Sequence, residues 1–229
     1  MFRGLRDRLS RRLPFAKTRQ PNEILQSALA RMQTMLERNL GGGKITVVLT
    51  SCREGEGVSS LAIAYARTVA KTGRSRVLLI DANLRRPDLH RWLGLDRAVG
   101  LGDQLAGRCT QGTIVRDMAM EGFSFLPAGT VGVDPAALLG GAAWEETLGA
   151  LREQFDVIIV DSPPLLDFPD APLLGRAADG VILVLTAELT RWEVAQHGKD
   201  LLEGAGASLL GVVLNRKPQY IPDVFYRFL

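Results

Sequence analysis

The chain has 229 residues, and its 46% apolar content is enough for one large domain with a sizeable core. Only 6% of the residues are aromatic, so the core must be built from Leu, Val, Ile and Ala, as in helices packed on a mostly parallel sheet. No apolar run approaches the roughly 18 residues of a membrane span, and no secretory signal is recognisable. Cys52 and Cys109 lack disulfide or metal spacing. These features exclude integral-membrane and disulfide-rich secreted classes and predict a reducing, cytoplasmic location.

Residues 1–20 are predicted to form a basic amphipathic tail. They hold seven Lys or Arg against one acid, and because the whole chain carries only +3, the remainder is net acidic. Apolar residues recur in the tail at helical spacing: Phe2, Leu5, Leu9 and Leu13. Such a tail is typical of a segment that lies on an anionic membrane surface, docks on a partner or extends into solvent. Peripheral attachment to the inner membrane is therefore an expectation, and nucleic-acid binding is not, because the rest of the chain is acidic.

Strand and helix patterns alternate along the rest of the chain. Residues 21–43 are expected to hold a helix over 22–39 followed by a glycine linker. Near-continuous Val/Ile/Leu runs predict buried strands at 45–49, 77–80, 157–160, 181–185 and 209–214, and helical patterns occur near 59–72, 143–154, 170–178 and 191–204. This alternation predicts an α/β domain over 44–216, with a doubly wound, mostly parallel sheet and helices on both faces. The less regular stretch 96–140 is expected to elaborate one edge, and 217–229 form a C-terminal tail.

A glycine-rich loop, Glu54–Ser60, follows the first predicted strand and precedes a helix. In that context backbone N–H groups and the helix N-terminus can hold phosphate oxygens. The predicted cofactor-binding residues of this loop are Gly55, Glu56, Gly57, Val58, Ser59 and Ser60. The two glycines permit close backbone approach, and Ser59 stands where a Mg²⁺-bound hydroxyl is expected. Alone, the loop is equally compatible with an ordinary glycine-containing turn.

Two carboxylates favour the phosphate site. Asp81 and Asp161 each end a buried strand, and ligands of open α/β sheets bind outside the carboxyl ends of the strands. Two acids beside one phosphate loop predict a Mg·nucleotide site.

These segments, in this order over about 44–216, resemble the cytoplasmic kinase domain of the bacterial tyrosine kinases (BY-kinases) that regulate capsule and exopolysaccharide synthesis, relatives of the ParA/MinD ATPases. The stretch 50–60, TSCREGEGVSS, is similar to the family's TSxxPGEGKST. LLIDANLRRPDLH at 78–90 resembles LLIDADLRRPxLH, and FDVIIVDSPPLLDFPDA at 155–171 resembles YDxVIIDTPPxLxxxDA. The resemblance implies a P-loop NTPase fold that binds ATP or ADP, with Mg²⁺ at Ser59, Asp81 and Asp161. It also implies that Asp81 and Asp161 would be the catalytic acids in an active member of the family, and that Asn215 contacts the adenine.

The sequence also departs from this family. Val58 replaces the lysine that would reach the β- and γ-phosphates, and Asn83 replaces the second acid of the DxD motif. Residues 23–29 lack both arginines of the family's oligomerisation motif, and only Tyr220 and Tyr226 stand where a tyrosine cluster is expected. Because positioning and charge neutralisation supply nearly all the catalysis of phosphoryl transfer, loss of the lysine predicts a severe loss of activity.

Three functions follow from these features. The first is a catalytically weak or inactive regulator that partners a membrane-bound polysaccharide co-polymerase or chain-length regulator. The second is an active ATPase or tyrosine kinase that uses a substitute cation, either from this chain, where Arg53, Arg85 and Arg86 are candidates, or from a partner. The third is a ParA/MinD-like positioning ATPase. An oligomer is compatible with all three.

Overall fold

The computed structural model describes residues 23–41, 43–109, 114–130, 132 and 134–216, which fold around one seven-stranded sheet. The strand order is β3-β4-β2-β5-β1-β6-β7, and every neighbouring pair is parallel except β3 with β4 at one edge. The strands are β1 (Ile45–Ser51), β2 (Val77–Asp81), β3 (Arg116–Asp117), β4 (Phe123–Leu126), β5 (Val157–Asp161), β6 (Gly180–Thr186) and β7 (Leu209–Asn215). The predicted mostly parallel sheet is confirmed.

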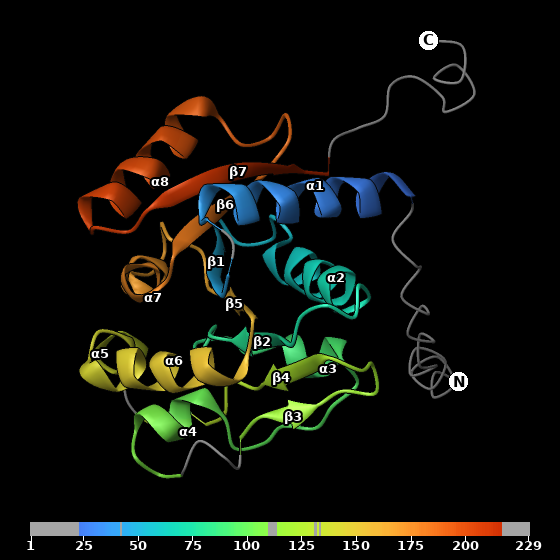
Figure 1. The fold of residues 1–229 in the computed structure, drawn as a ribbon. Coiled ribbons are helices and arrows are strands. Elements are labelled where there is room, and N and C mark those ends of the chain that lie inside the picture. The colour runs from blue at the N-terminus through green and yellow to red at the C-terminus, as the bar shows by residue number, and fades with distance from the viewer. Residues whose placement is uncertain (1–22, 42, 110–113, 131, 133, 217–229) are drawn as a thin grey trace, which may run out of the picture.

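Helices cover both faces of this sheet, as Figure 1 shows. Helix α2 lies on one face, where α1 packs beside it, and α4 to α8 lie on the other. The helices are α1 (Glu23–Asn39), α2 (Val58–Ala70), α3 (Leu89–Trp92), α4 (Leu101–Leu105), α5 (Pro135–Leu139), α6 (Ala142–Gln154), α7 (Asp170–Ala177) and α8 (Trp192–Gly204). Among the described residues, none of these helices combines the length and apolarity needed to cross a bilayer.

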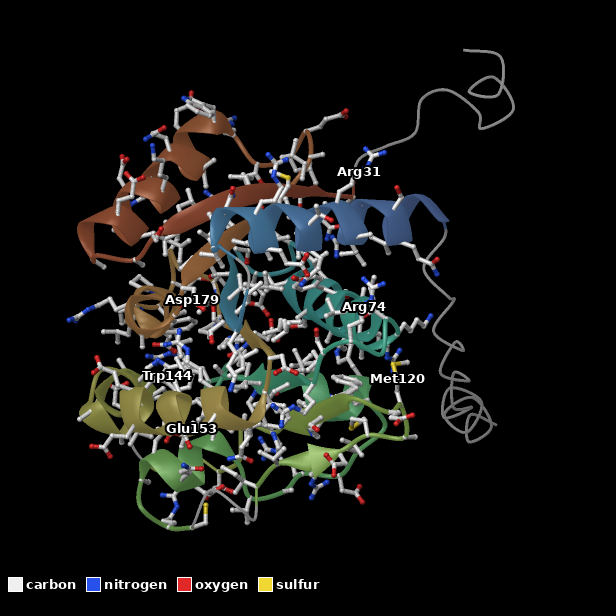
Figure 2. The ribbon with its side chains drawn as sticks, in the orientation of Figure 1. Arg31, Arg74, Met120, Trp144, Glu153 and Asp179 are labelled. Atoms are coloured by element: carbon white, nitrogen blue, oxygen red, sulfur yellow. The ribbon has the colours of Figure 1, made fainter. Side chains whose placement is uncertain are left out.

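The central strands are buried on both faces because consecutive side chains point to opposite sides of the sheet. In β5, Ile158 and Val160 belong to the core under α6 and α7, and Val157 and Ile159 to the core under α2. Trp144 of α6, labelled in Figure 2, is one of the largest fully buried side chains in the first of these cores. This two-sided burial explains why the strands read as continuous apolar runs.

The irregular stretch 96–140 does extend one edge, but it contains regular elements that the sequence analysis did not assign. Strand β4 pairs with β2, β3 pairs antiparallel with β4, and the short helices α4 and α5 flank them. Helix α2 begins at Val58, one residue earlier than expected. The predictions for the basic tail 1–20 and for Tyr220 and Tyr226 lie outside the described residues.

Helix α1 packs on the body of the domain through Leu29 and Leu36, which are 2% and 3% exposed and share a core with α2. We expect Leu36→Ala to lower the free energy of unfolding by about 2–5 kcal/mol, because it leaves a cavity. Met35→Ala, at the neighbouring position where the side chain is 61% exposed, should change it by about 0.5 kcal/mol or less. Urea denaturation measures both, and equal effects would show that α1 does not pack there.

Candidate functional site

A cleft of about 860 Å³ lies beyond the carboxyl ends of β1, β2 and β5, where Ser51, Asn83 and Ser162 line it, while Asp81 and Asp161 lie buried beneath and are not among its lining residues. This volume is in the range of small-molecule sites. The cleft is lined by all six predicted loop residues: Gly55, Glu56, Gly57, Val58, Ser59 and Ser60. The structure thus brings the predicted phosphate loop to the edge of the sheet where α/β domains bind ligands.

The loop has the backbone conformation that a phosphate cradle requires. Gly55 and Gly57 have φ angles of 85° and 91°, in the left-handed region that favours glycine. A Cβ atom on Gly57 would also lie 2.3 Å from the Asn215 Nδ2, so any other residue there would displace the Asn215 amide. Gly57 caps α2, whose first N–H groups therefore open towards the cleft and favour an anion there.

Asn215 and Glu56 attach this loop to the neighbouring strands. The Asn215 amide donates to the Glu56 carbonyl oxygen at 2.9 Å. The buried Glu56 carboxylate accepts from the Arg53 N–H at 2.9 Å, from the Thr186 N–H at 3.1 Å and from the Thr190 hydroxyl. Since that carboxylate is engaged by protein donors, Glu56 can offer a ligand its backbone rather than its side chain. Sequence reasoning missed Thr186 and Thr190, which lie about 130 residues away and form no motif.

Asp81 and Asp161 lie side by side at the ends of β2 and β5, where they are direct register partners. Asp161 Oδ2 accepts a 2.7 Å hydrogen bond from the Ser59 hydroxyl, so the three predicted metal ligands come together. Asp161 Oδ1 is buried and has no hydrogen-bond partner among the described residues. Mg²⁺ prefers oxygen ligands and takes few of them from the protein. A carboxylate oxygen without a partner, next to a serine hydroxyl and a second carboxylate, fits such an ion.

Burial raises the pKa of both acids. The pKa of Asp81 rises to about 7, against the opposing effect of N–H donors from Leu89 and Asn83. The pKa of Asp161 rises well above its usual range because of burial and then because of the neighbouring Asp81 charge. Keeping two carboxylates here costs folding free energy at neutral pH, which indicates a binding role rather than a stabilising one.

Asp161→Asn is therefore expected to stabilise the ligand-free protein. The raised pKa values mean that the native state holds protons that the unfolded chain releases near pH 4. Both groups thus favour folding at low pH. The Asp81 contribution is lost as the pH rises from about 4 to about 7, and the Asp161 contribution is lost in the same direction because its pKa is also raised. At pH 8 the uncharged amide should raise Tm by about 2–10 °C; the difference should shrink as the pH falls and vanish below about pH 4, where Asp161 is protonated in both the folded and the unfolded chain. The exposed cleft residue Asp167, changed to Asn, is the control, and an equal rise there would contradict the argument.

Five of the described arginines also line the cleft. Arg86 and Arg216 line it together with Arg91 and Arg97 near the exposed Trp92, and sequence analysis had singled out only Arg86 of these. Arg85 also lines the cleft, but its guanidinium makes a two-pronged 2.9 Å contact with the fully buried Asp170 and stacks on Phe168. Arg53 is exposed and is not among the described residues that line the cleft.

At the lysine position, Val58 is 8% exposed and its side chain belongs to the core beneath α2. An isopropyl group donates no hydrogen bond and carries no charge. The predicted loop residues and acids therefore lie together, but residue 58 brings no cation to them.

Comparison with known proteins agrees with this geometry. No protein-family model matches the chain. The tyrosine-protein kinase YwqD of Bacillus subtilis is 34% identical over 75% of this chain and 72% of its own length. The EpsB protein of Ralstonia solanacearum is 33% identical over 86% of this chain, which spans only 26% of EpsB.

Solved structures give the same family. The chimerical protein CapA2B2 matches with a TM-score of 0.81 and 27% identity over 88% of both chains. The kinase domain of the Escherichia coli tyrosine kinase ETK matches with a TM-score of 0.81 and 25% identity, over 91% of this chain and 84% of its own. MinD of Pyrococcus horikoshii, solved with Mg-ADP, has a TM-score of 0.65 and 23% identity over 81% of this chain and 76% of its own, a likeness of fold alone. The chain belongs to the bacterial tyrosine-protein kinases, a family with the P-loop fold.

Proposed function

We propose that this chain is a nucleotide-binding, catalytically weak or inactive regulator of polysaccharide synthesis or export. One observation carries the proposal: an assembled phosphate cradle, with Ser59, Asp81 and Asp161 together, has the buried, uncharged Val58 at its lysine position. Lysine loss weakens the hold on phosphate without removing the backbone donors of the loop, so binding can persist when phosphoryl transfer does not.

Mg²⁺ would be held by Ser59 and Asp161, with Asp81 beside them, and when bound it would neutralise phosphate charge. The described residues contain no group of three His, Cys, Asp or Glu side chains suited to a metal. The proposed ion is therefore one that phosphate oxygens and water help to hold, as is usual for Mg²⁺ in nucleotide sites. Asn215, at the other side of the loop, would approach the adenine.

The proposed partner is a membrane-bound polysaccharide co-polymerase or chain-length regulator. The family's capsule and exopolysaccharide role supports it, and so does the chimerical nature of the similar protein CapA2B2. The basic tail 1–20 is the segment we propose to lie at the inner membrane or on that partner.

Calorimetry with ATP and ADP, with and without Mg²⁺, tests the binding half of this proposal, and a phosphorylation assay tests the catalytic half. We expect Mg²⁺-dependent binding with no measurable autophosphorylation. Autophosphorylation that Asp161→Ala abolishes would overturn the inactive assignment, and no binding of either nucleotide would overturn the nucleotide assignment.

A further inference from the structure

The structure contains an exposed ion pair between the phosphate loop and the loop that leaves β2. The Arg86 Nη1 lies 2.8 Å from the Glu54 Oε2, and both residues line the cleft. The two side chains are 70% and 72% exposed. Through Glu54, the Arg86 guanidinium contacts the phosphate loop itself. The ion pairs described for Arg85 and Arg91 join these arginines to residues outside that loop.

Exposed ion pairs contribute little to stability, typically about 0–1 kcal/mol, so this pair opens at small cost. A phosphate group offers a guanidinium two parallel, charge-assisted hydrogen bonds and more negative charge than one carboxylate. A nucleotide in the cleft would therefore compete with Glu54 for Arg86. Arg85 cannot move in the same way, because its departure would leave the buried Asp170 carboxylate unpaired.

The backbone also presents Arg86 towards the cleft. The Asn83 Oδ1 accepts a 3.1 Å hydrogen bond from the Arg86 N–H and so shapes the turn after β2. Asn83, like Val58, departs from the family pattern within the site. Because Asn83 stands where the family has an acid, no carboxylate at position 83 competes with a phosphate group for the Arg86 guanidinium.

The order of the strands places Arg86 at the phosphate end of the proposed ligand. Asn215 lies on β7, on one side of the loop that follows β1, and Asp161 and Asp81 lie on β5 and β2, on the other side. If adenine lies at Asn215, the terminal phosphates point towards β5 and β2, and Arg86 follows β2.

We propose that Arg86 is the cation that contacts the terminal phosphate of a bound nucleotide, in the role left empty by Val58, and that Glu54 holds it aside in the free protein. This inference rests on the proposed nucleotide site. It adds the residue that contacts the terminal phosphate, Arg86, and an autoinhibitory ion pair between Arg86 and Glu54.

Calorimetric titration with Mg·ATP and Mg·ADP tests it on the wild type and on Arg86→Gln, Glu54→Gln and the double variant. We expect Arg86→Gln to weaken ATP binding about tenfold or more and ADP binding less, because the terminal phosphate of ATP is lost as a contact. Glu54→Gln should tighten ATP binding several-fold, and in the Arg86→Gln background that gain should disappear. Arg53→Gln is the matched control, an exposed arginine near the loop but outside the cleft lining, and should bind ATP as the wild type does.

Three results would overturn the inference and leave the nucleotide site intact: Arg86→Gln binding ATP like the wild type, Glu54→Gln tightening it without Arg86, or Arg53→Gln causing the loss instead. ATP binding by Val58→Lys but not by the wild type would also overturn it, because Arg86 would then not replace the lysine. No nucleotide binding by any variant, Val58→Lys included, would overturn the proposed function and this inference together. Thermal melts of each variant exclude misfolding, which is not expected at a position 70% exposed.

Discussion

Val58→Lys is expected to raise the rate of ATP turnover about 10²–10³-fold over the wild type, the factor that one preorganised charge-stabilising donor typically supplies. Residue 58 begins α2 at the phosphate loop and lines the cleft, so an ammonium group there enters an existing cradle. The aliphatic stem of a lysine can lie along the apolar surface that Val58 now covers, so the substitution should be tolerated. Binding of Mg·ATP should tighten as well.

Phosphate release and autophosphorylation assays measure this gain, and Val58→Met is the matched control because its side chain has similar length and no charge. Methionine should give no gain. If lysine gives none over a measurable wild-type rate, a substitute cation already operates and the inactive assignment is wrong. If the lysine variant binds ATP more tightly but does not turn it over, the remaining departures, Asn83 among them, are sufficient to block the chemistry.

The centre of the fold was predictable because the physical signal is local. Strands buried on both faces must be apolar at every position, so β1, β2, β5 and β6 appear in the sequence as near-continuous apolar runs. The edge strand β7 has a similar apolar run, although Val212 and Leu214 are 50% and 62% exposed. Parallel strands that end at one edge bring their terminal residues together, and this is why Asp81 and Asp161 could be paired before their register was known.

The edge of the sheet and the polar contacts of the cleft were not predictable by the same means. Strand β4 has four residues and β3 two, too short for a period to distinguish them from loop. The contacts Arg86–Glu54, Arg85–Asp170 and Glu56–Thr190 join residues that are 32, 85 and 134 positions apart, and pairings of this kind leave no trace in composition or spacing. Such contacts decide which arginine is available to a ligand, so the sequence alone could not choose among Arg53, Arg85 and Arg86.

Removal of the two glutamates of the phosphate loop should affect stability to very different extents. We expect Glu56→Ala to lower the free energy of unfolding by about 3 kcal/mol or more, since it removes the acceptor of the Arg53 N–H and of the Thr190 hydroxyl and leaves the Thr186 N–H only its 3.3 Å bond to the Thr190 Oγ1. For a domain of this size that corresponds to a fall in Tm of about 6–12 °C. Glu54→Ala removes only an exposed ion pair and should change stability by about 0.5 kcal/mol or less.

The same pair of variants separates loop geometry from loop charge in ligand binding. Glu56 connects the phosphate loop to the segment between β6 and α8, so its loss should loosen the backbone cradle and weaken nucleotide binding even at temperatures where the domain stays folded. Loss of Glu54 should instead leave the cradle intact. Thermal melts followed by calorimetry on both variants measure this difference. Equal melting temperatures for the two would show that the buried carboxylate does not hold the loop, and the preformed cradle inferred for this site would then need another support.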